Sequence, residues 1–128
     1  MNKVDKTYQI KATKSEVFDA LTNVEKIEQW SGASAKMDIA ADGAFSLWEG
    51  SIHGINQVVS ESKIVQLWKE ASWEAYSKCT FTLKEENQST ILSLEHTDIP
   101  ESSLASIDKG WDEYYLEPLK EMLENLDQ

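Results

Sequence analysis

The stretch SLASIDKGWDEYYLEPLKEMLENL, residues 103–126, decides the fold of this chain. Apolar side chains recur in it every three or four residues, which is the spacing of one face of an α-helix. We therefore expect one long helix near the carboxyl end. Its two large rings could fill the concave face of a curved sheet, and helix and sheet together could enclose a pocket. The predicted apolar stripe is Leu104, Ile107, Trp111, Tyr115, Leu119, Met122 and Leu126.

Between residues 33 and 97 the apolar pattern changes to a period of two, interrupted by turn-forming residues. Such alternation is typical of an antiparallel sheet with one covered face and one wet face. The clearest strand pair puts Cys79, Phe81, Leu83, Leu92, Leu94 and His96 on its apolar face. The predicted strands are 3–10, 34–39, 44–49, 51–59, 63–69, 76–84 and 90–97.

Two short helices are expected between the first strand and the rest of the sheet. Thr13 and Glu16 have the spacing of a capping box, and Thr22 and Glu25 repeat it, with Gly32 ending the second helix. In the long helix, Ser102 or Ser103 is the expected N-cap. Pro118 lacks an amide hydrogen, so we expect a kink or break there.

These elements predict an α+β fold of the helix-grip type. A curved antiparallel sheet of six to seven strands wraps a long C-terminal helix, with two short helices after the first strand. At 128 residues the chain has the length of one domain, and we expect residues 1–128 to form a single domain.

Several ordered Trp and Gly anchors carry a resemblance to a known family. They lie in Phe45–Gly54, in Ile64–Trp68, at Trp73 and in Gly110–Tyr115, with an opening segment at Ala20–Gly32. This pattern, over about residues 8–125, resembles the C-terminal domain of the activator of heat-shock-protein-90 ATPase. That family is part of the START-like, or Bet v-like, superfamily (SRPBCC).

The resemblance implies a binding function. Many members of the superfamily hold apolar ligands between helix and sheet. In the eukaryotic co-chaperones of this family, a separate N-terminal domain supplies the main grip on the chaperone, and the related C-terminal domain contacts the nucleotide-binding domains of the chaperone.

Charge and composition exclude some partners. The chain has 23 acidic residues, 12 lysines and no arginine, which gives a net charge of −11. Such a surface disfavours nucleic acid and anionic membranes, because both are recognised by clustered basic residues. The sequence has no apolar run of membrane-spanning length, and its first residues lack the apolar segment of a signal peptide. We expect a cytoplasmic protein.

Residues that usually carry catalysis or bind metals are scarce. His53 and His96 have no Cys or carboxylate at zinc-ligand spacing, so we expect neither a metal nor a cofactor. Cys79 could meet His96 across neighbouring strands, but its place on the apolar face favours a buried, unreactive thiol. We therefore name no catalytic residue and expect the protein not to be an enzyme.

The candidate cavity residues are those whose phase points them toward the long helix, together with the aromatic anchors. For the tryptophans two interpretations stay open, core anchor and cavity wall, and Trp48 or Trp68 is placed on the outer side of the sheet because Leu47 and Trp48 cannot share a strand face. His96 is either bonded to helix backbone or orients a ligand. The predicted lining is Trp30, Leu47, Trp73, Phe81, Leu94, His96, Trp111 and Tyr115.

The sequence thus favours a non-catalytic binding domain whose partner is a small apolar ligand or a protein. A co-chaperone that stimulates the heat-shock-protein-90 ATPase is the alternative, and a small START-like cyclase or hydrolase is a third. The long strands near 51–69 also predict an uncovered sheet edge, and with it a homodimer.

Overall fold

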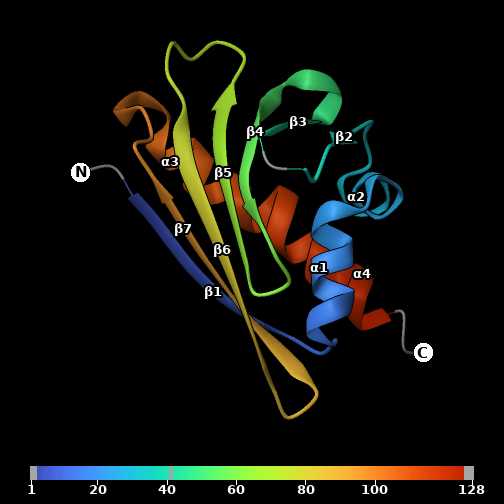
Figure 1. Cartoon of the computed structure of the whole chain (residues 1–128). Coiled ribbons are helices and arrows are strands. Elements are labelled where there is room, and N and C mark those ends of the chain that lie inside the picture. Colours follow the sequence, from blue (N-terminus) through green and yellow to red (C-terminus); the bar gives the residue numbers. More distant parts are fainter. Residues whose placement is uncertain (1–2, 41, 126–128) are drawn as a thin grey trace.

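The structure is a computed structural model that describes residues 3–40 and 42–125. The first strand, two short helices, six further strands and a C-terminal helical segment follow one another in the predicted order (Figure 1). The strands are β1 (Lys3–Ile10), β2 (Lys36–Met37), β3 (Gly43–Leu47), β4 (Ile52–Val59), β5 (Lys63–Glu70), β6 (Ser77–Glu86) and β7 (Ser89–Thr97). The helices are α1 (Lys14–Thr22), α2 (Val24–Ser31), α3 (Leu104–Gly110) and α4 (Glu117–Asn125), with shorter turns η1 (Trp48–Gly50), η2 (Glu101–Ser103) and the π-helical η3 (Trp111–Leu116).

All seven strands form one antiparallel sheet in the order β1-β7-β6-β5-β4-β3-β2. Consecutive strands pair as neighbours, except that the first strand returns to pair with the last. Along β6 and β7 the predicted apolar face is buried and the intervening residues are mostly exposed or half-buried. This alternation confirms the one-side-covered sheet.

One continuous C-terminal helical segment, α3-η3-α4, lies across the covered face of the sheet, and α1 and α2 pack beside it (Figure 1). The core lies between these helices and the sheet. The arrangement is the helix-grip fold that the sequence predicts, with two short helices after the first strand.

The helix caps agree with the sequence in one case and differ in the other. Thr13 accepts from the Glu16 amide at 3.1 Å and donates its own amide to the Glu16 carboxylate at 2.9 Å, so the first capping box is confirmed. The second box is wrong by one residue: Asn23 is the cap and accepts from the Glu25 amide. Thr22 is instead the last residue of α1, where its hydroxyl donates to the Phe18 carbonyl, and the extended backbone of Asn23 ends the helix.

Pro118 does not break the helix. The six residues before α4 form a π-helical turn, and the backbone stays right-handed at Gly110 and Glu117 on either side. A π-turn contains one extra residue, so the missing proline amide is accommodated without ending the helix. The extra residue also rotates the face that α4 turns toward the sheet. Leu116 and Leu123 are therefore buried, Met122 is half-buried, and the predicted Leu126 lies outside the described residues.

The strands expected to leave an open edge lie inside the sheet. β4 and β5 pair with each other, with β3 on one side and with β6 on the other, so the edges belong to β1 and the two-residue β2. The expectation that β4 and β5 leave an open edge for a homodimer is therefore wrong. β2 is shorter than the predicted 34–39 strand, and a short edge strand offers little backbone for pairing.

Candidate functional site

The C-terminal helical segment presents two rings to the sheet at successive turns. Trp111 and Tyr115 are both 3% exposed, and their ring centroids are 4.6 Å apart. Trp111 stacks on Trp68 of β5 at 5.6 Å, and Tyr115 stacks on Phe81 of β6 at 5.8 Å. Helix and sheet are thus joined through aromatic faces, as the sequence predicts for these two helix residues.

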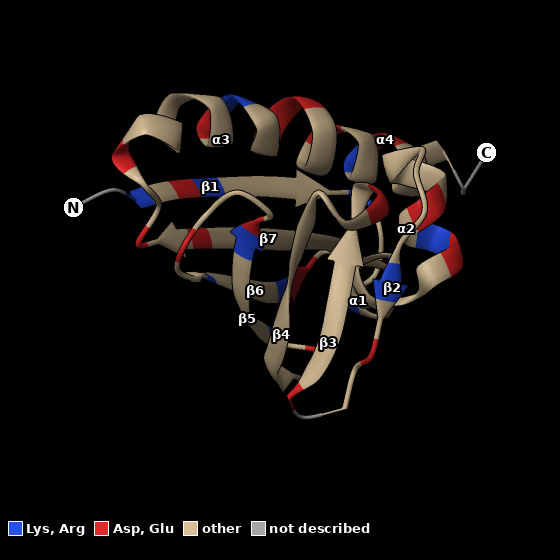
Figure 2. Cartoon of the chain, turned by 90° about the horizontal axis from the view of Figure 1, so that it is seen from above, with Lys and Arg blue, Asp and Glu red and all other residues tan. Residues whose placement is uncertain are grey.

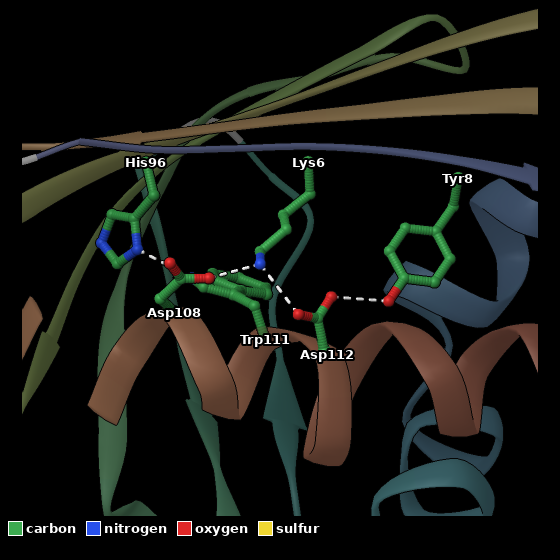
Figure 3. Close-up of polar contacts among 6 residues, drawn as sticks. All are labelled: Lys6, Tyr8, His96, Asp108, Trp111 and Asp112. Atoms are coloured by element: carbon green, nitrogen blue, oxygen red, sulfur yellow. Dashed lines mark hydrogen bonds and ion pairs between the residues drawn. The ribbon is translucent and has the colours of Figure 1, made fainter. Parts of the chain in front are cut away.

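A second tie is polar and lies deeper. The Trp111 Nε1–H donates to His96 Nδ1 at 2.9 Å, so Nδ1 carries no proton (Figure 3). The neutral imidazole then carries its proton on Nε2, which donates to Ser77 Oγ at 2.7 Å. Ser77 in turn donates to the Trp68 carbonyl at 2.5 Å. His96 therefore reaches the helix through a side chain and not through helix backbone.

The surroundings of His96 keep it neutral. Its side chain is fully buried, and this burial lowers the pKa of His96 from 6.5 to about 3. Both ring nitrogens are already bonded within the chain of contacts from Trp111 to Trp68, which leaves neither of them for a carboxylate. The geometry makes His96 a link between helix and sheet.

Cys79 lies directly opposite His96 in the register of β6 and β7. The pairing anticipated for these residues is therefore present in the backbone, but the imidazole nitrogens bond to Ser77 and Trp111. Burial raises the pKa of the Cys79 thiol well above its usual value. A neutral, buried thiol of this kind is a poor nucleophile.

A cavity of about 630 Å³ opens beside the aromatic pair, between the helical segment and the ends of β4 and β5. Its volume lies in the range of small-molecule sites. Most of its wall is apolar, and several aromatic rings contribute to it. The lining residues are Trp48, Ser51, Ile52, Trp68, Glu70, Ala71, Ser72, Ser106, Ile107, Gly110, Trp111, Tyr114 and Tyr115.

Of the eight predicted lining residues, Trp111 and Tyr115 line this cavity. The other six are buried and lie outside its wall. Trp30 and Phe81 contact the Tyr115 ring, Trp73 contacts the Trp68 ring, and His96 bonds Trp111. Leu47 and Leu94 belong to the same core. A ligand-binding role for the eight stays a prediction.

The sequence predicts Trp48 or Trp68 on the outer side of the sheet, but both line the cavity on the covered side. Trp68 is 4% exposed on the covered face, and its Nε1–H is buried without a hydrogen-bond partner among the described residues. Trp48 follows the last residue of β3 and has a left-handed φ of 50°. That turn ends the strand alternation, so Trp48 points inward beside Leu47, and its ring lies 6.2 Å from Tyr115.

Charged groups also tie the C-terminal helical segment to β1. Lys6 contacts the carboxylates of Asp108 and Asp112, the second at 2.8 Å, and the Tyr8 hydroxyl donates to Asp112 at 2.6 Å (Figure 3). The hydrogen bonds from Lys6 and Tyr8 hold the pKa of Asp112 below its usual value. Burial works against a charged Lys6, but the two carboxylates outweigh it and raise its pKa.

The described residues contain no group of three or more His, Cys, Asp or Glu side chains that could hold a metal ion. Within the same residues, no helix is both long and apolar enough to span a membrane. Acidic residues line the outward side of α3 and α4 (Figure 2). The outward acidic face contains the exposed residues Glu113, Glu117 and Glu121.

Curated proteins with a similar sequence are known. The chain is 28% identical over 109 residues to the human activator of 90 kDa heat shock protein ATPase homolog 1, a match that covers 83% of this chain and 32% of the relative. The chain spans about a third of the length of the curated relatives it matches. For this chain, the activities of those whole proteins are therefore proposals.

Solved structures agree with the fold. An HSP90 activator from Plasmodium falciparum superimposes with a TM-score of 0.89 at 27% identity, covering 96% of both chains. The Aha1 dimer from Colwellia psychrerythraea gives a TM-score of 0.84 at 17% identity and 97% coverage of both chains, which is a likeness of fold alone.

Residues 11–124 match the family described as activator of Hsp90 ATPase homolog 1-like protein. This match spans every strand of the helix-grip sheet except β1, and the C-terminal helical segment as far as Glu124. The chain therefore belongs to the activator of Hsp90 ATPase homolog 1-like family, within the START-like superfamily.

Proposed function

We propose that this chain is a non-catalytic binding domain that holds a small, largely apolar molecule in the cavity beside Trp111 and Tyr115. The observation that carries the proposal is the cavity itself, about 630 Å³ with walls that include Trp48 and Trp68. A closely packed core would have no space of this size. Burial of an apolar ligand against such rings is favourable because it removes apolar area from water.

Gly110 provides the test of this site. It lines the cavity, and a Cβ added there meets nothing nearer than the Tyr114 ring at 3.8 Å. Gly110→Leu should therefore fold and fill the cavity mouth. We expect the neutral dye N-phenyl-1-naphthylamine to bind the unaltered protein saturably at micromolar concentration, and Gly110→Leu to weaken this binding about tenfold, which corresponds to about 1.4 kcal/mol.

The matched control is Ala105→Leu, which adds the same side chain at an exposed position of α3 outside the cavity wall. It should bind the dye as the unaltered protein does. Thermal unfolding of both variants checks that each is folded. Absence of saturable binding to the unaltered protein, or equal binding by the Gly110→Leu variant, would contradict the cavity as a binding site.

A second function is supported by the relatives that are named activators of the 90 kDa heat shock protein ATPase. We infer that the chain stimulates this ATPase by docking through the acidic face of its C-terminal helical segment (Figure 2). Glu113, Glu117 and Glu121 follow one another at four-residue spacing and are all exposed, so they form one charged row. Such a row favours a basic surface on the partner.

The ATPase rate of the purified chaperone should rise when this chain is added. Changing the row to glutamine at all three positions should lower the stimulation several-fold at low salt and less at high salt, because screening already weakens charge attraction. Gly110→Leu, which leaves the row intact, should stimulate normally. A chaperone rate that this chain does not alter would remove the second function and leave the cavity proposal untouched.

A further inference from the structure

The cavity wall contains one charged side chain among the described residues that line it, the carboxylate of Glu70. Glu70 is the last residue of β5 and stands two residues after Trp68. Because side chains alternate along a strand, Glu70 and Trp68 share the covered face of the sheet. Its register partner on β4 is Ile52, which also lines the cavity.

Glu70 is half-buried as a residue, and no described residue gives its carboxylate a hydrogen bond or ion pair. Its neighbour Lys69 points to the opposite face, where its Nζ lies 5.5 Å from the ring centre of Tyr76. Lys109, next to Gly110 of the wall, pairs with Glu113 at 3.7 Å. Lys69 and Lys109 thus contact other side chains and not the Glu70 carboxylate.

Aromatic rings make up the rest of the charge-selective environment. Trp48, Trp68, Trp111 and Tyr115 all line the same space. The faces of such rings attract a cation through their quadrupole, with indole the most effective. An anion entering the cavity would meet the same rings and the unpaired carboxylate, and both disfavour it.

Resting on the cavity function proposed above, we propose that the preferred ligand is a cation with an aromatic or other apolar body, its charged group next to Glu70 and its body among the tryptophans. The positive charge completes the interaction that Glu70 lacks within the described chain. The ring system provides apolar contact and stacking area.

Three naphthalene compounds of nearly equal size isolate the charge: 1-naphthylmethylamine, a cation at pH 7; 1-naphthalenemethanol, which is neutral; and 1-naphthoate, an anion. Calorimetric titration of the full chain should give about tenfold tighter binding for the cation than for the anion, with the neutral compound between them. In Glu70→Gln the preference for the cation over the anion should fall several-fold, leaving only the smaller preference that the ring faces provide.

The control variant is Glu74→Gln, which changes the net charge equally but alters an exposed carboxylate outside this cavity wall. It should keep the full preference for the cation. An undiminished preference for the cation in Glu70→Gln, or three equal affinities in a protein that still binds the neutral dye, would overturn the charge inference alone. Failure of the dye and of all three compounds to bind would overturn the cavity function with it.

Discussion

Replacing Gly54 by alanine should destabilise the protein by about 3 kcal/mol or more, the upper range for overpacked cores. Gly54 lies within β4, and a Cβ there would stand 1.8 Å from the Leu67 carbonyl oxygen and 2.9 Å from the Phe45 ring. The nearer atom is backbone of the neighbouring strand, so β4 and β5 would have to separate. Denaturant unfolding measures the loss.

Gly110→Ala is the matched control, because it adds the same methyl group where there is space for it. The backbone at Gly110 has the helical angles φ −63° and ψ −36°, which alanine adopts readily. This variant should gain about 0.5–1 kcal/mol through the lower entropy of its unfolded chain. Equal stability of the two alanine variants would mean that β4 and β5 do not approach as closely as described.

Acid should weaken the fold between pH 7 and pH 5, and His96 should account for about 2 kcal/mol of the loss. The folded pKa of His96 is about 3 and its ordinary value is 6.5. Below pH 6.5 the unfolded chain binds a proton that the folded chain does not, so the free energy of unfolding falls by about 1.4 kcal/mol per pH unit. The decline continues toward pH 3 and stops there, because both states are then protonated.

His96→Asn tests this assignment, since its amide oxygen can accept from Trp111 and does not titrate. Its free energy of unfolding should be lower at pH 7 and nearly level from pH 7 to pH 5. His53→Asn removes the other histidine, which lies against Tyr76, and should keep the full decline. In the unaltered protein, NMR should show the His96 imidazole unprotonated at pH 5. A signal of the His96 imidazole that titrates near pH 6.5 would refute the buried neutral form.

Asp112 does not confuse that measurement. Hydrogen bonds from Lys6 and Tyr8 lower the pKa of Asp112 from 3.8. Asp112 therefore contributes to the free energy of unfolding above pH 3.8, and this contribution is lost only as the pH falls through the lower pKa of the folded state. The window from pH 7 to pH 5 lies above this region. The decline in that window therefore separates the histidine from this carboxylate.

The fold follows from the sequence because its signals are periodic. The two-residue alternation around Phe81 and Leu94 fixes which face of the sheet is covered, and the spacing of Trp111 and Tyr115 fixes which face of the helix covers it. The pairing of β1 with β7 is not written in any local pattern. It arises because the sheet adds its first strand beside its last, so that both face the same C-terminal helical segment.

The exact wall of the cavity is less predictable, because it depends on irregular backbone. Trp48 faces inward since two successive residues, Trp48 and Glu49, are left-handed, and non-glycine residues adopt that conformation rarely. Trp68 is on the covered face because of its position in the alternation of β5. The residues that share this face on either side, Gln66 and Glu70, are polar, so the sequence does not show the face as apolar. Glu70 gives no apolar signal at all.

The packing of the rings has an optical consequence. All five tryptophans of the chain belong to one connected series of ring contacts, which runs Trp73, Trp68, Trp111, Tyr115, Trp30, Trp48. Excitation absorbed by any indole can migrate to the others over such separations, so the emission of the whole molecule reports on one place. The intrinsic tryptophan fluorescence of the protein should therefore change when a molecule enters the cavity beside the helix, without an added label.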